Sequence, residues 1–308
     1  MHPVFDPIVE IEELPLEACD MYDIGMVDSP HTFIANNILV HNSIFLPALP
    51  LIENADSKTD DELVQDTLKI SAELQTVINK YYDKYADRFH NVSEHYWNIK
   101  QELVSRRAFW GSAKKRYAMW IINKNGLPFD EAEIKGFDVV RSSFPQAFRD
   151  FMESIIGDIL HDILPDELNK KIRDFKYQYK NNELSDILLP SGVKEISKYQ
   201  TATKSIPIHV NSSLNYNKLL NLFNIEGQYP IIDDGDKIMW GYLRQNPYNF
   251  NTLAIRGHDD PPEILEFMEK YTDREKIFER SLISKLQSIW DDLGWGQIAL
   301  NENNDDFF

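Results

Sequence analysis

The first 42 residues differ in charge from everything that follows, and this difference limits what the chain can fold into. Residues 1–42 contain eight acidic side chains and no lysine or arginine, whereas residues 43–308 contain 42 acidic and 32 basic side chains. Short apolar runs between turn residues, such as those at 32–34 and 38–40, predict an all-β segment. Because so short a β segment buries too little surface to be stable alone, it needs a partner chain or the rest of the protein.

The composition of the whole chain is that of a globular protein with about two domains. Of its 308 residues, 43% are hydrophobic and 27% are charged. No apolar run approaches the roughly 20 residues of a membrane span, and the N-terminus lacks the basic and apolar regions of a signal peptide. The single cysteine, Cys19, favours a reducing cytoplasm and no disulfide framework. The net charge of −18 argues against a nucleic-acid partner unless the basic residues are clustered.

Residues able to cut and rejoin a peptide bond gather at the bond between Asn42 and Ser43. The side-chain amide of Asn42 can attack its own backbone carbonyl and cyclise, provided that a proton donor and a base stand nearby. Near neutral pH, His31 and His41 can each act as the proton donor or as the base. The Ser43 hydroxyl is a nucleophile that can accept an acyl group. Taken alone, His-Asn-Ser is more often a simple turn.

The wider pattern around this bond resembles the C-terminal end of an intein. Tyr-Asp-Ile at 22–24, His-Thr-Phe-Ile-Ala at 31–35 and the run at 37–43 cover both sequence blocks of that family at the right spacing. The resemblance implies a role for five residues: Asn42 cyclises, His41 and His31 assist, Asp23 coordinates the two cleavage steps, and Ser43 is the nucleophile of the retained protein.

The segment matches only half of an intein. No N-terminal Cys or Ser nucleophile and no Thr-x-x-His block precedes it. The resemblance is therefore to the C-terminal half of a split intein, which implies trans-splicing with a partner chain that carries the N-terminal half. The acidic composition indicates electrostatic steering toward a basic partner, although a merely soluble surface explains it too.

The remainder predicts alternating strands and helices. Thr59 and Glu62 form a capping box that starts a long helix, whose apolar residues recur at helical spacing from Leu63 to Phe89. Strands are predicted at 43–46, 96–103, 107–110, 115–122, 206–210 and 237–243, with a hairpin turn at 123–126, and helices at 146–163, 165–180 and 263–289.

Basic residues cluster in the first half of this remainder and alternate with aromatic ones. On neighbouring strands they would form a cationic face suited to phosphates. A solvated strand face is the alternative interpretation. The basic members are Arg106, Arg107, Lys114, Lys115, Arg116, Lys135 and Arg141, and the aromatic members are Phe109, Trp110, Tyr117 and Trp120.

This cluster resembles the palm of family B DNA polymerases of the T-even phage type. The palm motifs stand at 100–102, 107–110, 114–117, 135–136 and 141–145, and weaker thumb motifs stand at 196–199, 207–209, 215–217, 235–237 and 246–247. The resemblance implies a DNA-directed DNA polymerase, a nucleotidyltransferase that uses dNTPs. Its implied DNA-binding residues are Lys114, Lys115, Arg116 and Tyr117 near the primer 3′ end, Lys135 and Arg141 on the backbone, and Glu102 near the metal pair.

The same resemblance places the catalytic metal ions on another chain. In the family, a Tyr-Gly-Asp-Thr-Asp-Ser turn precedes an apolar strand, and this chain supplies only the Ser43 end of it. The two aspartates that bind Mg²⁺ are therefore expected on the partner fragment. At the other end, Phe307 and Phe308 resemble the peptide that docks such polymerases on a sliding clamp, although a frayed hydrophobic end is possible.

The expected architecture is α+β, with a small all-β, Hint-type intein fragment followed by polymerase palm strands and a largely helical thumb. The expected divisions are 1–42 (split intein), 43–145 (palm), 146–300 (thumb) and 301–308 (clamp-binding tail). The expected function is the C-terminal fragment of a split, phage-encoded polymerase that binds primer–template DNA in the host cytoplasm. The alternative is a non-catalytic DNA-binding subunit that assembles with its partner without splicing.

Overall fold

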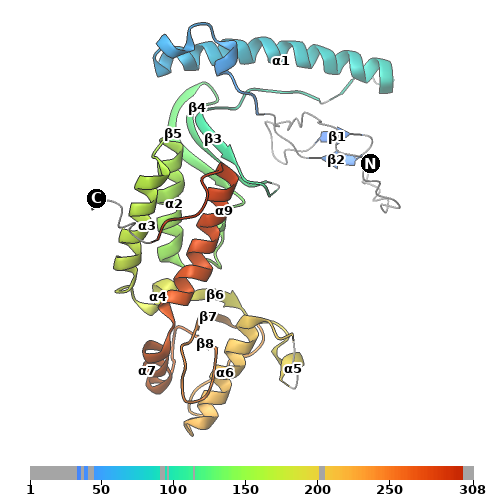
Figure 1. The fold of residues 1–308 in the computed structure, drawn as a ribbon. Coiled ribbons are helices and arrows are strands. Elements are labelled where there is room, and N and C mark those ends of the chain that lie inside the picture. The colour runs from blue at the N-terminus through green and yellow to red at the C-terminus, as the bar shows by residue number, and fades with distance from the viewer. Residues whose placement is uncertain are drawn as a thin grey trace, which may run out of the picture. The chain divides into compact units, whose positions relative to one another are not determined.

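The protein is a mixed α+β chain, as predicted, and it divides into two compact units. The computed structural model describes residues 33–35, 38–40, 45–90, 94–95, 97–113, 115–200 and 205–300 (Figure 1). The first unit comprises Met1–Val104 and Ile122–Phe129, and the second comprises Ser105–Ile121 and Asp130–Phe308. The predicted four-part division stays a prediction.

The first unit begins with a small hairpin of β1 (Phe33–Ala35) and β2 (Ile38–Val40), which pair antiparallel with Phe33 opposite Val40. These are two of the predicted strands. Two 3₁₀ turns follow, η1 (Leu49–Leu51) and η2 (Ala55–Ser57). The strand predicted at 43–46 is wrong for Phe45 and Leu46, which belong to no strand.

The long helix α1 (Asp60–His90) starts at the predicted capping box. The Thr59 backbone N–H and hydroxyl both donate to Glu62 Oε2 at 2.8 Å, and the Glu62 N–H donates back to Thr59 Oγ1 at 3.4 Å. This reciprocal pair satisfies backbone donors of the first helical turn. The same hydrogen bonds hold the pKa of the Glu62 carboxyl below its usual value.

An extended segment runs back along α1 in place of the predicted strand at 96–103. The Ile99 N–H donates to Asn79 Oδ1 at 2.8 Å, and the Gln101 N–H donates to Gln75 Oε1 at 2.9 Å. Because helix side chains satisfy these backbone groups, residues 97–102 form no strand ladder, and the strand prediction is wrong there.

The central sheet has the order β3 (Leu103–Trp110), β4 (Tyr117–Lys124) and β5 (Leu127–Lys135). The predicted hairpin turn is confirmed, since Asn125 and Gly126 both have positive φ, at 53° and 82°. Positive φ at both central residues is the signature of a type I′ turn, which Asn-Gly favours. The strand β5 was not predicted, because its acidic residues and Pro128 lower its β propensity.

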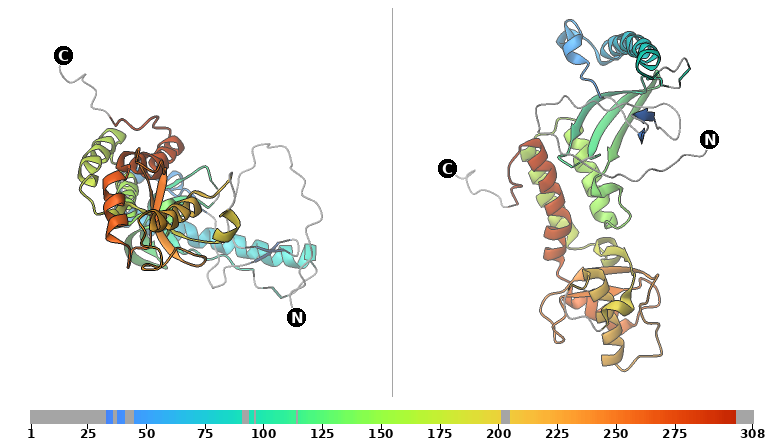
Figure 2. Two further views of the ribbon diagram at one scale, coloured as in Figure 1. Left: turned by 90° about the horizontal axis from the view of Figure 1, so that it is seen from below. Right: turned by 90° about the vertical axis from the view of Figure 1, so that its right-hand side faces the viewer.

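Three helices of the second unit pack around an aromatic core. The helices α2 (Gln146–Leu160) and α3 (Pro165–Tyr179) stand close to their predicted positions, and α9 (Ser284–Leu293) lies beside them in both views (Figures 1 and 2). The Tyr179 ring lies 5.4 Å from Phe148 and 5.3 Å from Phe278. The core is continuous from Phe109 to Trp290, so it ties the strands to the helices.

The rest of the second unit is a small antiparallel sheet with helices on it. Its strands are β6 (Leu189–Gly192), β7 (Lys237–Tyr242) and β8 (Thr252–Ile255), with Leu189 opposite Trp240 and Trp240 opposite Ala254. The strand β7 matches the prediction at 237–243. The helices α6 (Ile208–Leu222) and α7 (Pro262–Tyr271) contact β8, and the short helices α4 (Leu184–Ile187) and α5 (Ile196–Tyr199) complete the region.

Two predictions fail in this region. Residues 206–210 are not a strand: Pro207 caps α6, and the apparent period-two alternation there is too short to distinguish a strand from a helix start. The helix predicted at 263–289 is interrupted at Thr272, whose ψ of 128° leaves the helical region. Asp273 then caps a new helix by accepting from the Lys276 N–H. That helix consists of α8 (Arg274–Ile277), the π-helical segment η4 (Phe278–Ile283) and α9.

Candidate nucleic-acid interface

Several of the predicted site residues lie outside the described residues. They are the splicing residues Asp23, His31, His41, Asn42 and Ser43, together with Lys114, Phe307 and Phe308. The backbone of β2 ends at Val40, one residue before His41.

The loop between β3 and β4 carries basic residues that were predicted to bind DNA, and hydrogen bonds link its described residues. The Gly111 N–H donates to the Arg116 carbonyl at 2.8 Å, and the Arg116 N–H donates to the Ala113 carbonyl at 3.2 Å. The Ser112 N–H donates to Asp292 Oδ1 in α9 at 3.0 Å. The first two bonds lie within the loop, and the third anchors it to a helix that is distant in sequence.

The Arg116 side chain points into the second unit rather than to solvent. Its Nη1 donates to Ser288 Oγ at 2.9 Å, and its guanidinium lies 4.7 Å from the centre of the Phe137 ring. Only 13% of the side chain is exposed, and Nη2 lies 3.9 Å from Asp138 Oδ2. Arg116 therefore holds the loop against α9, and its predicted contact with DNA stays a prediction.

Asp138 is a buried carboxylate around which three cations gather. Besides Arg116, it has Arg141 Nη1 at 3.1 Å and Lys285 Nζ at 3.6 Å. Its side chain is 12% exposed, whereas those of Arg141 and Lys285 are 61% and 42% exposed. One negative charge thus faces three positive ones, and two of the cations reach solvent. Lys285 was missed by the sequence reasoning, because nothing in the sequence shows that α9 returns to this loop.

The remaining basic residues of the motif lie next to this loop. Lys115 is exposed, has a positive φ of 63°, and pairs with no carboxylate in the part of the chain that the structure describes. Its carbonyl oxygen lies 2.4 Å from where a Cβ on Gly136 would stand. Lys135 is 57% exposed and lies 3.7 Å from Glu133, which also accepts from the Tyr117 hydroxyl at 3.4 Å.

We call this group of residues the Asp138 cluster, and define it as Lys115, Arg116, Lys135, Asp138, Arg141 and Lys285. It is assembled from the β3–β4 loop, the end of β5, the turn η3 (Asp138–Val140) and α9. The solvent-facing charges of the cluster are cationic, although the chain as a whole carries a net charge of −18. The cluster is therefore suited to bind a polyanion.

Two other predicted site residues, Arg107 of the basic face and the acidic Glu102, are not members of this cluster. Arg107 forms an ion pair with Asp162 just beyond α2, which neutralises its charge. Glu102 belongs to the first unit, where its carbonyl accepts from the Asn125 N–H at 2.8 Å beside the hairpin turn.

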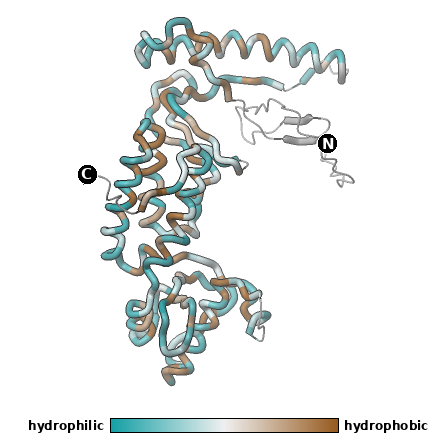
Figure 3. The backbone as a smooth tube through the Cα atoms, in the orientation of Figure 1, coloured by the Kyte–Doolittle hydropathy of each residue, from teal (hydrophilic) through white to brown (hydrophobic). Residues whose placement is uncertain are grey.

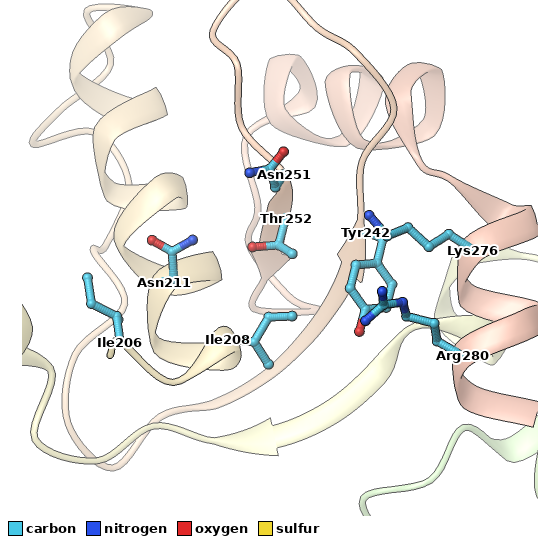
Figure 4. Close-up of a pocket in the computed structure, with 8 residues that line it drawn as sticks. All are labelled: Ile206, Ile208, Asn211, Tyr242, Asn251, Thr252, Lys276 and Arg280. Carbon is cyan, nitrogen blue, oxygen red and sulfur yellow. The ribbon is translucent and has the colours of Figure 1, made fainter. Parts of the chain in front are cut away.

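A second cationic feature of the second unit is a cavity of about 500 Å³, drawn in Figure 4. Lys276 Nζ and the Arg280 guanidinium lie 5.0 and 5.9 Å from the centre of the Tyr242 ring, and neither has a carboxylate partner among the described residues. Arg280 stands in the π-helical η4, a conformation frequent at functional sites. The lining residues are Ile206, Ile208, Asn211, Tyr242, Asn251, Thr252, Lys276 and Arg280.

The cavity also holds an unsatisfied polar atom. Thr252 is 3% exposed, and its Oγ1 has no hydrogen-bond partner among the described residues. A buried hydroxyl without a partner costs free energy unless a ligand or water completes it. Two unpaired cations, an aromatic face and free hydroxyl and amide groups together suit a phosphate ester. Sequence reasoning missed this cavity, because its residues come from four separate segments.

Comparison with known proteins assigns no family to the chain: no protein-family model matches it, and no curated protein matches it. Within the described ranges, no three His, Cys, Asp or Glu side chains gather closely enough to hold a metal ion. Among the same residues, no helix combines the length and the apolar character that crossing a bilayer requires.

Proposed function

We propose that this chain is the C-terminal fragment of a split family B DNA polymerase of the phage type. In this proposal, trans-splicing between Asn42 and Ser43 joins it to an N-terminal fragment. The observation that carries the DNA-binding part is the Asp138 cluster, in which segments distant in sequence bring Lys115, Lys135, Arg141 and Lys285 together. The motif resemblances support the polymerase and splicing parts.

The cluster would act by contacting the phosphates of the primer–template duplex. Lysine and arginine contacts to phosphate give affinity and position the duplex without reading its sequence, which is what a replicative enzyme requires. The cavity lined by Lys276 and Arg280 offers a second phosphate contact in the same unit. The two features would bind the duplex at two separate places.

The polymerase chemistry of this proposal needs Mg²⁺. When bound, two such ions clamp the attacking and leaving oxygens during phosphoryl transfer from a dNTP. The proposal assigns their aspartate ligands to the partner fragment, whose metal-binding turn would continue into Ser43. The role of this chain is then to hold the primer–template, with Glu102 near the metal pair and Phe307 and Phe308 on a sliding clamp.

The splicing chemistry belongs to the junction residues. The Ser43 hydroxyl would attack the partner's acyl group and break its bond to the first residue of the N-terminal intein half, which leaves with the Ser43 proton, so that the acyl group becomes an ester on Ser43. The Asn42 side-chain amide then attacks its own backbone carbonyl. The bond to the Ser43 nitrogen breaks, and His41 or His31 supplies the proton that the nitrogen needs. Transfer of the acyl group from the Ser43 oxygen to this nitrogen leaves an ordinary peptide bond, and residues 1–42 are released.

Intact-mass measurement tests the splicing part. We expect that co-expression with the N-terminal fragment yields one longer chain and a free segment of residues 1–42. Asn42→Ala should abolish the spliced product, and an unchanged product in this variant would overturn the proposal. A stable complex whose 42–43 bond stays intact would instead favour the non-catalytic, non-splicing DNA-binding subunit.

Salt-dependent binding of primer–template DNA tests the other part. The full chain should bind a labelled duplex weakly, and Lys115→Ala with Arg141→Ala should weaken it further. Removing two phosphate contacts should make the slope of log affinity against log salt less steep by about 2. The matched control is Lys170→Ala with Lys180→Ala, which removes one exposed cation of α3 and one exposed cation directly after its last residue. Equal losses in the two double variants would show that the Asp138 cluster is not a specific contact surface.

A further inference from the structure

The cavity beside the Tyr242 ring holds two positive charges that no carboxylate neutralises within the described ranges. Lys276 Nζ and the Arg280 guanidinium lie 5.0 and 5.9 Å from the centre of the ring. The acidic side chains nearest to Lys276 in sequence are engaged elsewhere: Asp273 accepts from the Lys276 backbone N–H at 3.0 Å, and Glu275 pairs with a lysine of α3. Two like charges beside one ring repel each other, so binding of an anion lowers the free energy of the site.

The helix that carries these two cations presents them as a pair. Lys276 belongs to α8 and Arg280 to the π-helical η4, and residues four positions apart share one side of a helix. Lys276 is half-buried and Arg280 is exposed. Because both reach the same ring, both can act on one ligand.

Neutral hydrogen-bonding groups lie beside the cations. Tyr242 and Thr252 are direct partners in the β7–β8 ladder, so their side chains share one face of the sheet. Figure 4 shows them between Asn211 of α6 and the two cations. Thr252 is 3% exposed, and its Oγ1 has no hydrogen-bond partner among the described residues. A hydroxyl that is buried in this way gains most from a ligand atom that completes its hydrogen bond.

The cavity is larger than a phosphate group needs. Its volume of about 500 Å³ lies within the usual range of small-molecule sites. Ile206 and Ile208 give it an apolar part, and the lower region of Figure 3 shows that the chain around it carries both hydrophobic and hydrophilic residues. The remaining volume therefore suits an organic group attached to the phosphate.

The charges narrow the class of phosphate. A phosphate monoester carries about two negative charges near neutral pH, whereas a phosphodiester of the DNA backbone carries one. Two cations without a carboxylate partner match the monoester. Hydrogen bonds from charged donors to phosphate oxygens are among the strong ones, so a second charge on the ligand is well rewarded here.

We propose that this cavity binds a phosphate monoester of nucleotide size. Lys276 and Arg280 hold the doubly charged phosphate, Thr252 donates its hydroxyl hydrogen bond to the ligand, and the isoleucines contact its organic part. The inference rests on the proposed function only for the source of the ligand, which is the 5′-phosphate end of a DNA strand or a free nucleotide. A diester of the duplex backbone meets the same cations with one charge fewer, so it is the weaker ligand.

Calorimetric titration of the full chain tests the ligand class. The probe is deoxyadenosine 5′-monophosphate, compared with its phosphate methyl ester, which keeps the base and the sugar and carries one charge fewer. We expect the monophosphate to bind at least tenfold more tightly than the methyl ester. Lys276→Gln with Arg280→Gln should weaken binding of the monophosphate at least tenfold. Thr252→Val, which keeps the cations and the side-chain shape, should weaken it at least threefold.

The matched control is Lys218→Gln with Lys237→Gln. It removes two exposed cations of α6 and β7 that do not line the cavity, and it should change the affinity less than twofold. Thermal unfolding of each variant shows that the fold is kept. Equal affinity for the monophosphate and the methyl ester would overturn the inference. So would unchanged monophosphate affinity in the variant of Lys276 and Arg280.

Two primer–template duplexes, with and without 5′-phosphates, identify the source of the ligand. A 5′-phosphate that tightens binding to the native chain, and not to the variant of Lys276 and Arg280, identifies a DNA end, and no difference identifies a free nucleotide. A chain that splices and binds the duplex but not the monophosphate would refute the inference and leave the proposed function. A chain that binds the monophosphate but neither splices nor binds the duplex would do the reverse.

Discussion

Gly136 lies so close to the backbone of Lys115 that a Cβ at position 136 would come within 2.4 Å of the Lys115 carbonyl oxygen. Gly136 also has a positive φ of 71°, and Lys115 itself has one of 63°. The end of β5 and the β3–β4 loop therefore touch through backbone atoms. This contact sets where the Lys115 side chain of the Asp138 cluster leaves the loop.

The first prediction concerns this contact. Gly136→Ala should lower the free energy of unfolding by about 3 kcal/mol, because a backbone clash adds to the cost of a positive φ. It should also weaken DNA binding, since the loop must shift. Chemical denaturation and duplex titration measure the two effects.

The control for this variant is Gly126→Ala in the hairpin turn. Gly126 has a similar φ of 82°, but a Cβ there would meet nothing within 4 Å. It should cost only about 1 kcal/mol, the conformational part alone. An equal loss of unfolding free energy in the two variants would show that the close approach of Gly136 to the Lys115 backbone does not matter for stability.

The second prediction concerns Asp138. Asp138→Ala leaves the largely buried Arg116 without its carboxylate, and removing one partner of a buried ion pair costs about 3 kcal/mol. Glu131→Ala, at an exposed position of β5, should change stability by less than about 0.5 kcal/mol. Thermal unfolding of both variants measures the difference. A loss at Asp138 no larger than at Glu131 would show that the carboxylate does not support the cluster.

The sequence predicts the local parts of the candidate site but not its assembly. The sequence alone predicts a basic cluster edged by aromatic residues, formed by Lys115, Arg116 and Tyr117 and by the later Lys135 and Arg141. That Arg116 turns inward depends on Ser288 and Phe137, which only the tertiary fold brings to it. Lys285 and the cavity residues Lys276 and Arg280 were missed for the same reason.

For the fold, too, features that depend on neighbouring residues were predictable, and features that depend on residues distant in sequence were not. The capping box at Thr59 and the Asn125-Gly126 turn were predictable, because their hydrogen bonds and φ values depend on neighbouring residues. The segment at 97–102 was misread as a strand, because its backbone partners are side chains of Gln75 and Asn79. A propensity for extended structure does not specify which groups will satisfy the backbone.

The third prediction concerns the cavity. Lys276→Ala with Arg280→Ala should weaken primer–template binding at least tenfold and make the salt slope less steep by about 2, since two phosphate contacts are lost. The double variant of Lys170 and Lys180 again serves as the control. Thr252→Val should weaken binding without changing the slope, because it removes a hydroxyl and no charge. An unchanged slope in the first variant would show that the cavity does not contact phosphate.

The last prediction concerns pH and His209 in α6. Burial lowers the pKa of the His209 imidazole below its usual value, because a partly buried ring has less water around it to stabilise the protonated, charged form. The folded state therefore binds its proton less readily than the unfolded state. Stability from this residue is complete above the unfolded pKa of about 6.5 and is lost as the pH falls through that value toward the folded pKa.

Thermal unfolding at pH 7.5 and 5.5 measures this effect. The native chain should lose melting temperature between the two values, and His209→Gln should lose less, because glutamine does not titrate. His258→Gln is the matched control, since it makes the same replacement at a different histidine of the same unit. If the His209 variant lost as much melting temperature as the native chain, the pH dependence would have to come from other groups.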